Sequence, residues 1–254
     1  MKVREAVVLA AGLGTRLALG QPKFAVSVRG VPLLYFSTLL AVQTGVQRLL
    51  IVVASSYLDV AKQLAAPLER LSVRVQVIPN PEPHRENGYS LLLAVPHITT
   101  APILLFMADH LLPRSVASRL LRSSGDLVIA GDRSPRFVDV NEATRIQAVA
   151  SRVRAIGKHL PSYTHIDMGA FLLGSRFLSF IRQFREAPHL PLSKLVQAAV
   201  DAGLDVRVAE LCGVPWTDID TPTDLRSLLS GERQPVLNYV YAELRTLIQR
   251  CLAS

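Results

Sequence analysis

Two cations and three glycines follow the first apolar run of the chain, in the stretch LAAGLGTRLALGQPK from Leu9 to Lys23. The cations are Arg16 and Lys23, and the lysine directly follows a proline. Glycines let backbone N–H groups wrap closely around phosphate oxygens, and fixed cations offset the charge of those oxygens. The pattern therefore predicts a long glycine-rich loop that holds a triphosphate, with Arg16 and Lys23 as its charged groups.

Two common classes of phosphate-binding loop do not fit this stretch. A dinucleotide-binding fingerprint needs a third glycine at the position where the chain has Leu17. A Walker A loop needs a lysine that directly follows a glycine, whereas Lys23 follows Pro22. A plain surface turn would require neither the arginine nor the proline–lysine pair at this spacing. A triphosphate loop of a third kind is the interpretation that remains.

Strand-like and helix-like segments alternate through the first half of the chain. Short apolar runs rich in β-branched residues predict buried strands at 5–11, 48–55, 73–78, 102–110 and 126–132. Helices are expected between them, at 32–45, 57–71 and 90–98. This alternation predicts an α/β fold whose mostly parallel sheet carries helices on both faces. Ligands of such sheets bind at the carboxyl ends of the strands, where the glycine-rich loop and Asp109 are expected to lie.

The second half of the chain departs from this alternation. The segment 133–175 is predicted to form strands and turns that make an insertion closing over the site. Helices are expected near 175–186 and 191–202, a strand at 205–211, and a helix from Thr221 to Leu229. We therefore divide the chain into a catalytic domain, 1–230, which contains the acceptor-site insertion, and a linker with a C-terminal amphipathic helix, 231–254.

Composition limits the classes of protein that the chain can belong to. Of 254 residues, 50% are hydrophobic, and only two are cysteines, too few for a disulfide framework. The first residues lack the long apolar region of a signal peptide, and no window of about 18 apolar residues suits a membrane span. A soluble cytoplasmic protein is expected. The net charge of +8 raises nucleic acid as a ligand. However, the basic residues are scattered and no aromatics interleave with them, so no nucleic-acid binding is predicted.

Further segments share the order of motifs of a known family. The first stretch resembles the signature of the nucleoside-triphosphate sugar-phosphate nucleotidyltransferases. Over about residues 3–229 the chain resembles the CTP:inositol-1-phosphate cytidylyltransferases of that superfamily. The matching segments are NPEPHRENGYSLLLA (80–94), MADH (107–110), DRSPRFVDVNEATRI (132–146), IGKHL (156–160), IDMGAFLL (166–173) and WTDIDTPTDL (216–225). The resemblance implies a Rossmann-like, mostly parallel mixed sheet flanked by helices, of the nucleotidyltransferase (glycosyltransferase-A-like) type.

The resemblance also implies a reaction, in which CTP and inositol 1-phosphate give CDP-inositol and pyrophosphate for compatible-solute or phospholipid synthesis. The attacking oxygen belongs to a phosphate that is already ionised, so an in-line attack on the α-phosphate needs no general base. The protein must bring two polyanions together and stabilise charge on the leaving pyrophosphate. The residues expected to do this, by this resemblance, are Arg16, Lys23 and Lys158.

Two polyanions also imply a divalent metal ion, Mg²⁺, which prefers one or two carboxylates together with phosphate oxygens and water. The candidate ligands are Asp109, at a predicted strand end, and Asp218 or Asp220. Asp109 could instead cap the helix that follows it. In the sequence DTPTD, Asp220 or Thr221 could cap a helix whose first residue is Pro222. Asp218 would then be the metal ligand, unless the two aspartates share the ion.

Residues from three segments are expected to bind the nucleotide. Cytosine presents an N4 amino donor, so its recognition needs an acceptor. The loop RENGYS (85–90) is predicted to supply it through a backbone carbonyl or the Asn87 side chain. Gly88 would permit close approach, and Ser90 would cap the following helix while it contacts the nucleotide. The whole predicted nucleotide-binding set is Leu9, Ala10, Ala11, Gly12, Gly14, Thr15, Glu86, Asn87, Gly88, Ser90 and Ala108.

The acceptor is a dianion with five hydroxyls, so its pocket needs cations and hydrogen-bond acceptors. Phosphate is expected to be held by Arg136, Arg145 and Lys158, and hydroxyls by Asp139, Glu142 and Asp167, with Gly169 beside them. Charged residues at such spacing are also typical of a solvated face. Among these residues, Lys158 and Asp167 are the strongest candidates.

Other functions remain open at this stage. Phosphocholine or another polyol phosphate could be the acceptor, although no aromatic cluster in 133–175 suits a choline cage. A non-catalytic nucleotide-binding regulator is a second alternative, which the presence of Lys23 and Asp109 disfavours. The tail has apolar residues on one helical stripe: Val236, Val240, Leu244, Leu247, Ile248 and Cys251. This helix could dock on its own domain, on a second copy in a homodimer, or peripherally at a membrane beside a CDP-alcohol phosphotransferase.

Overall fold

The computed structural model describes residues 3–12, 14, 17 and 20–253. At its centre lies a mixed sheet of nine strands in the order β5-β4-β1-β6-β11-β8-β12-β10-β9, with β9 also pairing with β11. The strands of this sheet are β1 (Glu5–Ala10), β4 (Arg48–Ala54), β5 (Arg74–Asn80), β6 (Ile103–Met107), β8 (Leu127–Asp132), β9 (Arg145–Val149), β10 (Arg152–Gly157), β11 (His165–Leu173) and β12 (Val206–Leu211). Two small sheets pair β2 (Ser27–Val28) with β3 (Val31–Pro32) and β7 (His110–Leu111) with β13 (Thr217–Asp218).

Most strands of the large sheet point the same way. β4 runs parallel to β5 and to β1, and β1 runs parallel to β6. β11 is antiparallel to both of its neighbours, β6 and β8, while β8 and β12 are parallel. All six residues of β1 are buried, because helices cover both faces of the sheet. The predicted α/β fold with a mixed, mostly parallel sheet is confirmed.

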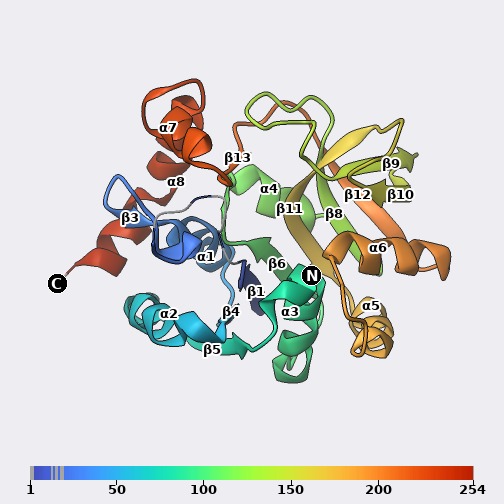
Figure 1. The fold of residues 1–254 in the computed structure, drawn as a ribbon, viewed down its shortest axis with the longest axis horizontal. Coiled ribbons are helices and arrows are strands. Elements are labelled where there is room, and N and C mark those ends of the chain that lie inside the picture. The colour runs from blue at the N-terminus through green and yellow to red at the C-terminus, as the bar shows by residue number, and fades with distance from the viewer. Residues whose placement is uncertain (1–2, 13, 15–16, 18–19, 254) are drawn as a thin grey trace.

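Helices cover the sheet on both sides (Figure 1). One core cluster packs them against alternate strand residues such as Val8; its helices are α1 (Leu33–Gln43), α2 (Leu58–Ala65), α4 (Arg114–Leu121), α7 (Pro222–Ser230) and α8 (Gln234–Leu252). The opposite cluster includes the next residues along the strands, such as Leu9, and its helices are α3 (Glu86–Ala94), α5 (Ser175–Phe180) and α6 (Leu192–Asp201). Short 3₁₀ turns lie at η1 (Lys23–Ala25), η2 (Ser55–Tyr57), η3 (Ala66–Leu71), η4 (Pro83–Arg85), η5 (Val95–His97) and η6 (Ile181–Phe184).

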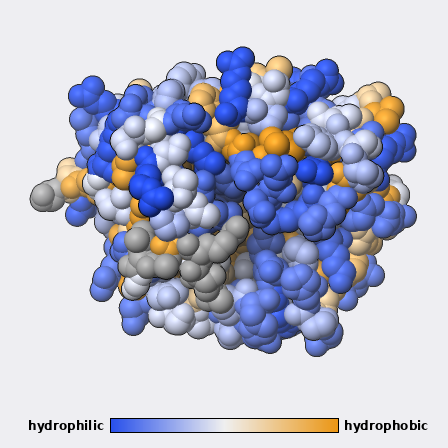
Figure 2. Space-filling model, turned by 45° about the horizontal axis from the view of Figure 1, so that its top comes forward, coloured by the Kyte–Doolittle hydropathy of each residue, from blue (hydrophilic) through white to orange (hydrophobic). Residues whose placement is uncertain are grey.

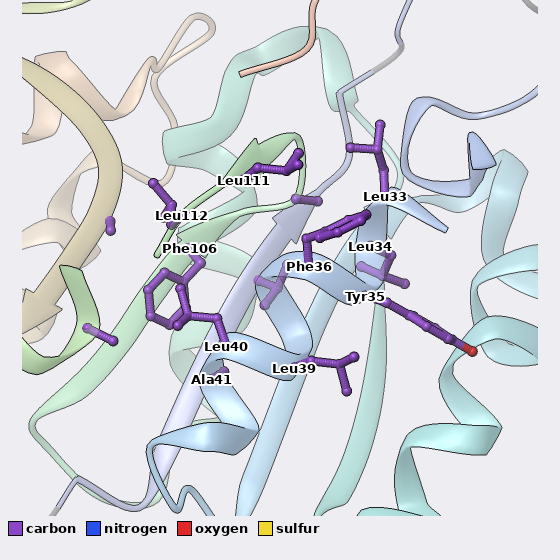
Figure 3. Close-up of a cluster of buried hydrophobic side chains, with 14 of the residues drawn as sticks. Leu33, Leu34, Tyr35, Phe36, Leu39, Leu40, Ala41, Phe106, Leu111 and Leu112 are labelled. Atoms are coloured by element: carbon purple, nitrogen blue, oxygen red, sulfur yellow. The ribbon is translucent and has the colours of Figure 1, made fainter. Parts of the chain in front are cut away.

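The helix α1 is buried on all sides. Nine consecutive residues, Leu33 to Ala41, are buried. Figure 3 shows their side chains meeting Phe106 from β6 and Leu111 and Leu112 from the segment that follows. The hydroxyl of Ser37, one of the polar groups in this run, donates to the carbonyl oxygen of Met107 at 2.6 Å. The helix therefore fixes the chain at the end of β6, where Asp109 follows.

The segment 133–175 is not a simple insertion, which corrects the sequence interpretation. Its last strand, β11, lies between β6 and β8 in the middle of the sheet. Nine buried or half-buried residues, HIDMGAFLL, form it, and such an apolar strand is stable only inside the sheet. The remainder of the segment, with β9 and β10, extends the sheet at its far edge. The segment thus ends in a core strand, β11, which follows the edge strands β9 and β10 in the sequence.

Two predicted helices have different limits from those expected. The helix predicted at 57–71 is α2 followed by the 3₁₀ turn η3, where Pro67 lacks the N–H that an α-helix would use. The helix predicted at 90–98 begins at Glu86 and gives way to η5 around Pro96. Ser90 therefore lies inside α3 and does not cap it, contrary to the prediction.

The C-terminal helix α8 docks on its own domain, one of the positions that the sequence left open. Its stripe packs against α1, α7 and η3, and the residues it buries are Val236, Leu237, Val240, Leu244, Ile248 and Cys251. Leu247 is half-buried against the same core. No helix among the described residues is long and apolar enough to cross a membrane. On the face drawn in Figure 2, hydrophilic residues predominate. The division at residue 231 stays a prediction.

Truncation of Leu244 to alanine tests whether α8 is part of the core. Leu244 is 1% exposed in the cluster that includes α1. Loss of a buried leucine side chain typically costs about 2–5 kcal/mol, so we expect the free energy of unfolding to fall by that amount. Gln249→Ala, at an exposed position of the same helix, is the matched control and should change it little. Equal stability of the two variants in urea denaturation would show that α8 is not held by this core.

Candidate active site

A cleft of about 810 Å³ opens at the carboxyl ends of β1 and β6. It brings together twelve of the predicted site residues, which come from the whole length of the chain. They are Leu9, Ala11, Gly12, Gly14, Lys23, Glu86, Asn87, Ser90, Asp109, Lys158, Asp167 and Asp220. This is the edge of the sheet at which the sequence analysis expected the ligand.

The glycine-rich stretch bends back toward Lys23. Gly14 has φ of +61°, and a Cβ atom there would lie 2.9 Å from the Cβ of Lys23. A glycine is therefore required both by the backbone conformation and by the close approach. Thr15 and Arg16, two of the predicted site residues, lie outside the described residues. Ala10 is buried in β1, facing the α1 side of the sheet, and does not line the cleft.

The first catalytic candidates meet in one charged cluster. The Nζ of Lys23 donates to Oδ2 of Asp109 at 2.5 Å and also donates to Oδ1 of Asp220. The Lys23 side chain is only 11% exposed, and the two carboxylates are 28% and 32% exposed. Burial works against the charge on Lys23, but the two carboxylates outweigh it and raise the pKa of the ammonium above its usual value. The cation is thus held charged between Asp109 and Asp220.

Asp109 has a second charged partner in His110. Its Oδ1 lies 2.6 Å from Nδ1 of the imidazole. Burial alone would raise the pKa of Asp109, yet Lys23 and His110 together hold that pKa well below its usual range. Burial likewise works against the charge on His110, but Asp109 and then Asp218 raise the pKa of the imidazole to about 9. The cluster keeps Asp109 ionised and His110 protonated at neutral pH.

The structure decides between the capping alternatives for these aspartates. Asp109 caps no helix, because α4 begins at Arg114 after Pro113. Thr221 caps α7 and forms a capping box with Asp224. Asp220 is therefore not the cap, and its carboxylate faces Lys23 instead. Asp218 pairs with His110 between β13 and β7 but does not line the cleft.

The donor set fits a magnesium ion with two protein ligands. One ammonium contacts both Asp109 and Asp220, so the two carboxylates converge on one place, and they offer only the oxygen donors that Mg²⁺ prefers. Among the described residues, no group of three or more His, Cys, Asp or Glu side chains could hold a metal ion. Phosphate oxygens and water would complete such a site. Burial raises the pKa of Asp218, which makes it a poorer ligand than the other two.

The predicted nucleotide loop is a helix start, and its polar groups bond to the protein. Ser90 accepts a hydrogen bond from Nδ2 of Asn80 at 2.9 Å. Oδ1 of Asn87 accepts one from the backbone N–H of Leu192 at 2.7 Å. Gly88 does not line the cleft, and a Cβ there would lie 2.5 Å from the carbonyl oxygen of Leu190. The oxygen of Asn87 is thus turned toward Leu192, and the close approach that Gly88 permits is made by Leu190.

The predicted acceptor residues divide into two groups. Lys158 and Asp167, the strongest candidates, line the cleft. Burial raises the pKa of Asp167 to about 6, although its Oδ1 accepts a hydrogen bond from the N–H of Gly169 at 2.9 Å. Gly169 itself lies against the ring of His110. The backbone N–H of Ala108 donates to the carbonyl oxygen of Leu9. Neither residue lines the cleft.

The other four predicted acceptor residues do not line the cleft. Arg145 donates to the carbonyl oxygen of Leu160 at 3.0 Å and lies over the ring of Tyr163. Asp139 accepts from the N–H of Asn141, which makes it a turn residue. Arg136 and Glu142 are exposed in the loop after β8. Their positions correct the expectation that they bind the acceptor within this cleft.

Eight cleft-lining residues were not predicted: Pro83, Met107, Thr144, His159, His189, Pro191, Leu192 and Ser193. Four of these belong to one segment, 189–193, which lies at the start of α6. That segment reaches the cleft because α6 packs on both α3 and β10. Only long-range packing places it there, and nothing in its own sequence signals a site.

The fold and this cluster together define a nucleotidyltransferase. The chain belongs to the MobA-like NTP transferase domain family, whose model matches residues 6–165. It is similar over 95% of its length to a solved structure described as the inositol-1-phosphate CTP transferase from T. maritima, with 26% identity, a TM-score of 0.86, and 97% of that chain covered. A putative glucose-1-phosphate thymidylyltransferase from Bacillus anthracis shares the fold, with 15% identity, a TM-score of 0.76, and 88% and 93% of the two chains covered.

Curated relatives extend the comparison. A protein named "Bifunctional IPC transferase and DIPP synthase" from Rubrobacter xylanophilus is 35% identical over 222 residues, covering 87% of this chain and 50% of the relative. The protein of the same name from Archaeoglobus fulgidus is 34% identical over 226 residues, covering 89% of this chain and 43% of the relative. The chain thus spans about half the length of the curated relatives it matches. The resemblance inferred from the sequence motifs is confirmed.

Proposed function

We propose that the protein transfers the cytidylyl group of CTP to inositol 1-phosphate and releases pyrophosphate, giving CDP-inositol. The observation that carries this proposal is the similarity over nearly the full length of both chains to the inositol-1-phosphate CTP transferase structure. The names of the curated relatives, which begin with IPC transferase, support the same reaction.

The charged cluster supports the chemistry of the transfer. A phosphate oxygen of the acceptor attacks the α-phosphorus of CTP, a new P–O bond forms on one side, and the bond to pyrophosphate breaks on the other. The attacking oxygen is already ionised, so the work of the protein is positioning and charge stabilisation. Lys23 lies at the end of the glycine-rich stretch and remains charged, so in this proposal it stabilises the leaving pyrophosphate. We retain Arg16 as a second such cation by its sequence position alone.

Asp109 and Asp220 would hold Mg²⁺, which supplies Lewis-acid neutralisation of the phosphate charge when it is bound. In this proposal Lys23 donates to the phosphates of CTP in place of one or both carboxylates. The strongly lowered pKa of Asp109 supports its role, because an ionised carboxylate is the form that binds a metal ion. Asp218 acts beside them by keeping His110 charged.

The base is selected by a donor of Asn87 rather than by an acceptor, in a revision of the sequence prediction. Because the bond from the N–H of Leu192 turns Oδ1 of Asn87 toward α6, we infer that the Nδ2 donor faces the ligand. Cytosine has an acceptor at N3, whereas uracil carries a hydrogen there. A fixed N–H donor that faces N3 therefore accepts cytosine and opposes uracil.

In this proposal the acceptor binds at Lys158 and Asp167, both of which line the cleft. The ammonium of Lys158 would hold the phosphate of inositol 1-phosphate, and the carboxyl of Asp167 would bind ring hydroxyls. His159, which also lines the cleft, is a further candidate for the hydroxyls. These three residues fit a polyol phosphate better than a choline phosphate, since no aromatic cage accompanies them.

A panel of substrates tests this function directly. Pyrophosphate release is measured with each of the four nucleoside triphosphates against inositol 1-phosphate, phosphocholine, glycerol phosphate and a hexose 1-phosphate. CTP with inositol 1-phosphate is expected to give the highest kcat/KM. Faster turnover of UTP with the hexose 1-phosphate would assign the protein to a different branch of the family. Binding of CTP without turnover of any acceptor would favour the regulator instead.

We further infer that the protein acts in the cytoplasm, where CTP is available, in agreement with the absence of a membrane-spanning helix among the described residues. Association with a second copy, or with a membrane CDP-alcohol phosphotransferase, remains part of the proposal. Since the apolar stripe of α8 is buried in its own domain, such contacts would use the outer face of the helix. Tyr239 and Leu252, 48% and 45% exposed, lie on α8 and are its large exposed apolar residues among those described.

A further inference from the structure

One wall of the cleft is held in place by an arginine that does not itself line it. The wall is the segment 185–193, which leads into α6 and contributes His189 and Ser193 to the cleft. Nε and Nη2 of Arg85 donate to the carbonyl oxygen of Ala187 at 3.1 and 2.7 Å, and Nη2 also donates to the carbonyl oxygen of Arg185. One guanidinium thus binds two backbone carbonyls of this segment, those of Arg185 and Ala187.

Arg85 is itself held rigidly. Its Nη1 donates to Oε2 of Glu82 at 3.1 Å, and its guanidinium lies 3.7 Å from the ring centroid of Tyr89. The hydroxyl of Tyr89 donates to the same Glu82 carboxylate at 3.0 Å. The Arg85 side chain is only 12% exposed. A planar guanidinium that both stacks and donates several hydrogen bonds fixes its partners in a way that a lysine cannot.

The backbone near Arg85 also contacts the wall directly. The carbonyl oxygen of Arg85 accepts from the N–H of Leu190 at 3.0 Å. A Cβ atom at Gly88 would lie only 2.5 Å from the carbonyl oxygen of Leu190, so the wall packs directly against the backbone of α3. Two independent contacts therefore set the position of Leu190 and of the residues that follow it.

The same wall determines which way the amide of Asn87 faces. The first residue of α6, Leu192, has Pro191 before it as a cap without a side-chain acceptor. Oδ1 of Asn87 supplies that acceptor at 2.7 Å. A backbone N–H can only donate, so the oxygen of the amide must point to Leu192 and its NH₂ group elsewhere. If the wall moved, the amide would be free to turn over and offer its oxygen to the ligand.

We propose that Arg85 is a positioning residue for base selection: it fixes the wall 185–193, through which the Leu192 N–H locks Asn87 as a donor toward the nucleotide base. This inference rests on the proposed function for the identity of the preferred base. Its own content is that Arg85 controls how strongly one pyrimidine is preferred over the other. A donor locked in place rejects a base that presents a hydrogen, whereas an amide that can turn over accepts both.

The test compares the affinities of CTP and UTP by titration calorimetry, together with kcat and KM for each. In Arg85→Met the ratio of the two dissociation constants is expected to shrink about tenfold, within the range that one locked polar contact can give. KM for CTP should rise more than kcat falls, since Lys23 and Asp109 are untouched. Gly88→Ala, which displaces Leu190 from the other side, should shrink the ratio in the same way. Arg85→Lys should lie between the wild type and Arg85→Met.

Arg48→Met is the matched control. Arg48 also donates to a backbone carbonyl, that of His97 at 2.5 Å, and to Gln76 at 2.6 Å, but it does not line or border the cleft. Its loss should lower the melting temperature and leave the CTP-to-UTP ratio unchanged. An unchanged ratio in a folded Arg85→Lys or Gly88→Ala variant would overturn the inference. Absence of turnover of inositol 1-phosphate with CTP would instead contradict the proposed function, while a smaller preference for CTP over UTP in Arg85→Met would still support the role of Arg85.

Discussion

Replacement of Asp109 by alanine is expected to lower kcat by about 10³-fold, the rate equivalent of the several kcal/mol that a bound metal ion contributes to charge stabilisation. The expectation rests on the position of this carboxylate. It follows β6 directly, is fixed there by the contact of Ser37 with Met107, and is kept ionised by Lys23 and His110. Removal of Mg²⁺ from the wild type with EDTA should abolish turnover in the same assay, steady-state pyrophosphate release.

The effect of Asp109 can be separated from a general loss of stability. Asp59→Ala removes an exposed aspartate of α2 and should leave both kcat and the melting temperature unchanged. The affinity of Mn²⁺ for the complex with CTP, measured by electron paramagnetic resonance, should fall in Asp109→Ala and not in Asp59→Ala. A crystal structure with CTP in which the metal ion contacts neither Asp109 nor Asp220 would refute the assignment.

Replacement of Lys23 by alanine is expected to lower kcat by about 10²–10³-fold, the usual loss when one fixed group that stabilises developing charge is removed. Lys23 is mostly buried and held between two carboxylates, so its ammonium is already oriented before the reaction. Lys23→Arg should not restore the rate fully, because a planar guanidinium cannot occupy the place of a compact ammonium. Steady-state kinetics of the two variants measure this.

The burial of Lys23 also predicts an effect of this variant on the fold. Lys23→Ala leaves Asp109 and Asp220 facing each other without their shared ammonium. Some loss of melting temperature is therefore expected in the absence of metal, and Mg²⁺ should restore part of it. Lys62→Ala, an exposed lysine of α2, is the control. A folded Lys23→Ala enzyme with kcat/KM close to that of the wild type would remove Lys23 from the catalytic residues.

The residues whose position follows from one strand were predictable from sequence. The apolar run before the glycines predicts β1, and the run before Asp109 predicts β6, so both loops had to reach the same edge of a parallel sheet. Lys23 and Asp109 lie together as this argument requires. Their catalytic roles stay predictions.

Residues whose position depends on antiparallel pairing or on packing were not predictable in this way. The order of strands around β11 cannot be read from its apolar pattern, which suits any buried strand. The choice of Asp218 or Asp220 as the metal ligand depended on which residue caps α7. Thr221 and Asp224 form the capping box there, so neither Asp218 nor Asp220 is needed as the cap. Arg136, Asp139, Glu142 and Arg145 could not be placed relative to the cleft from sequence, because the presence of charged residues does not reveal which way their side chains face.

Asn87 illustrates a different limit. Its type and place near the nucleotide were apparent from the sequence, but the direction of its hydrogen bond was not. That direction depends on the N–H of Leu192, which lies 105 residues further along the chain. A side chain amide has both a donor and an acceptor, and only its tertiary partner decides which of the two is used.

The contact between Lys23 and Asp220, which spans 197 residues, also determines when the protein can become active during synthesis. A ribosome adds about 5–20 residues per second, and N-terminal parts generally fold first. The glycine-rich loop and Asp109 are therefore made well before Asp220, and a nascent chain that ends before β13 lacks both Asp218 and Asp220. The cluster is complete only when nearly all of the sheet and the strand pair β7–β13 have formed, so incomplete chains lack one of the two carboxylates proposed to hold the metal ion.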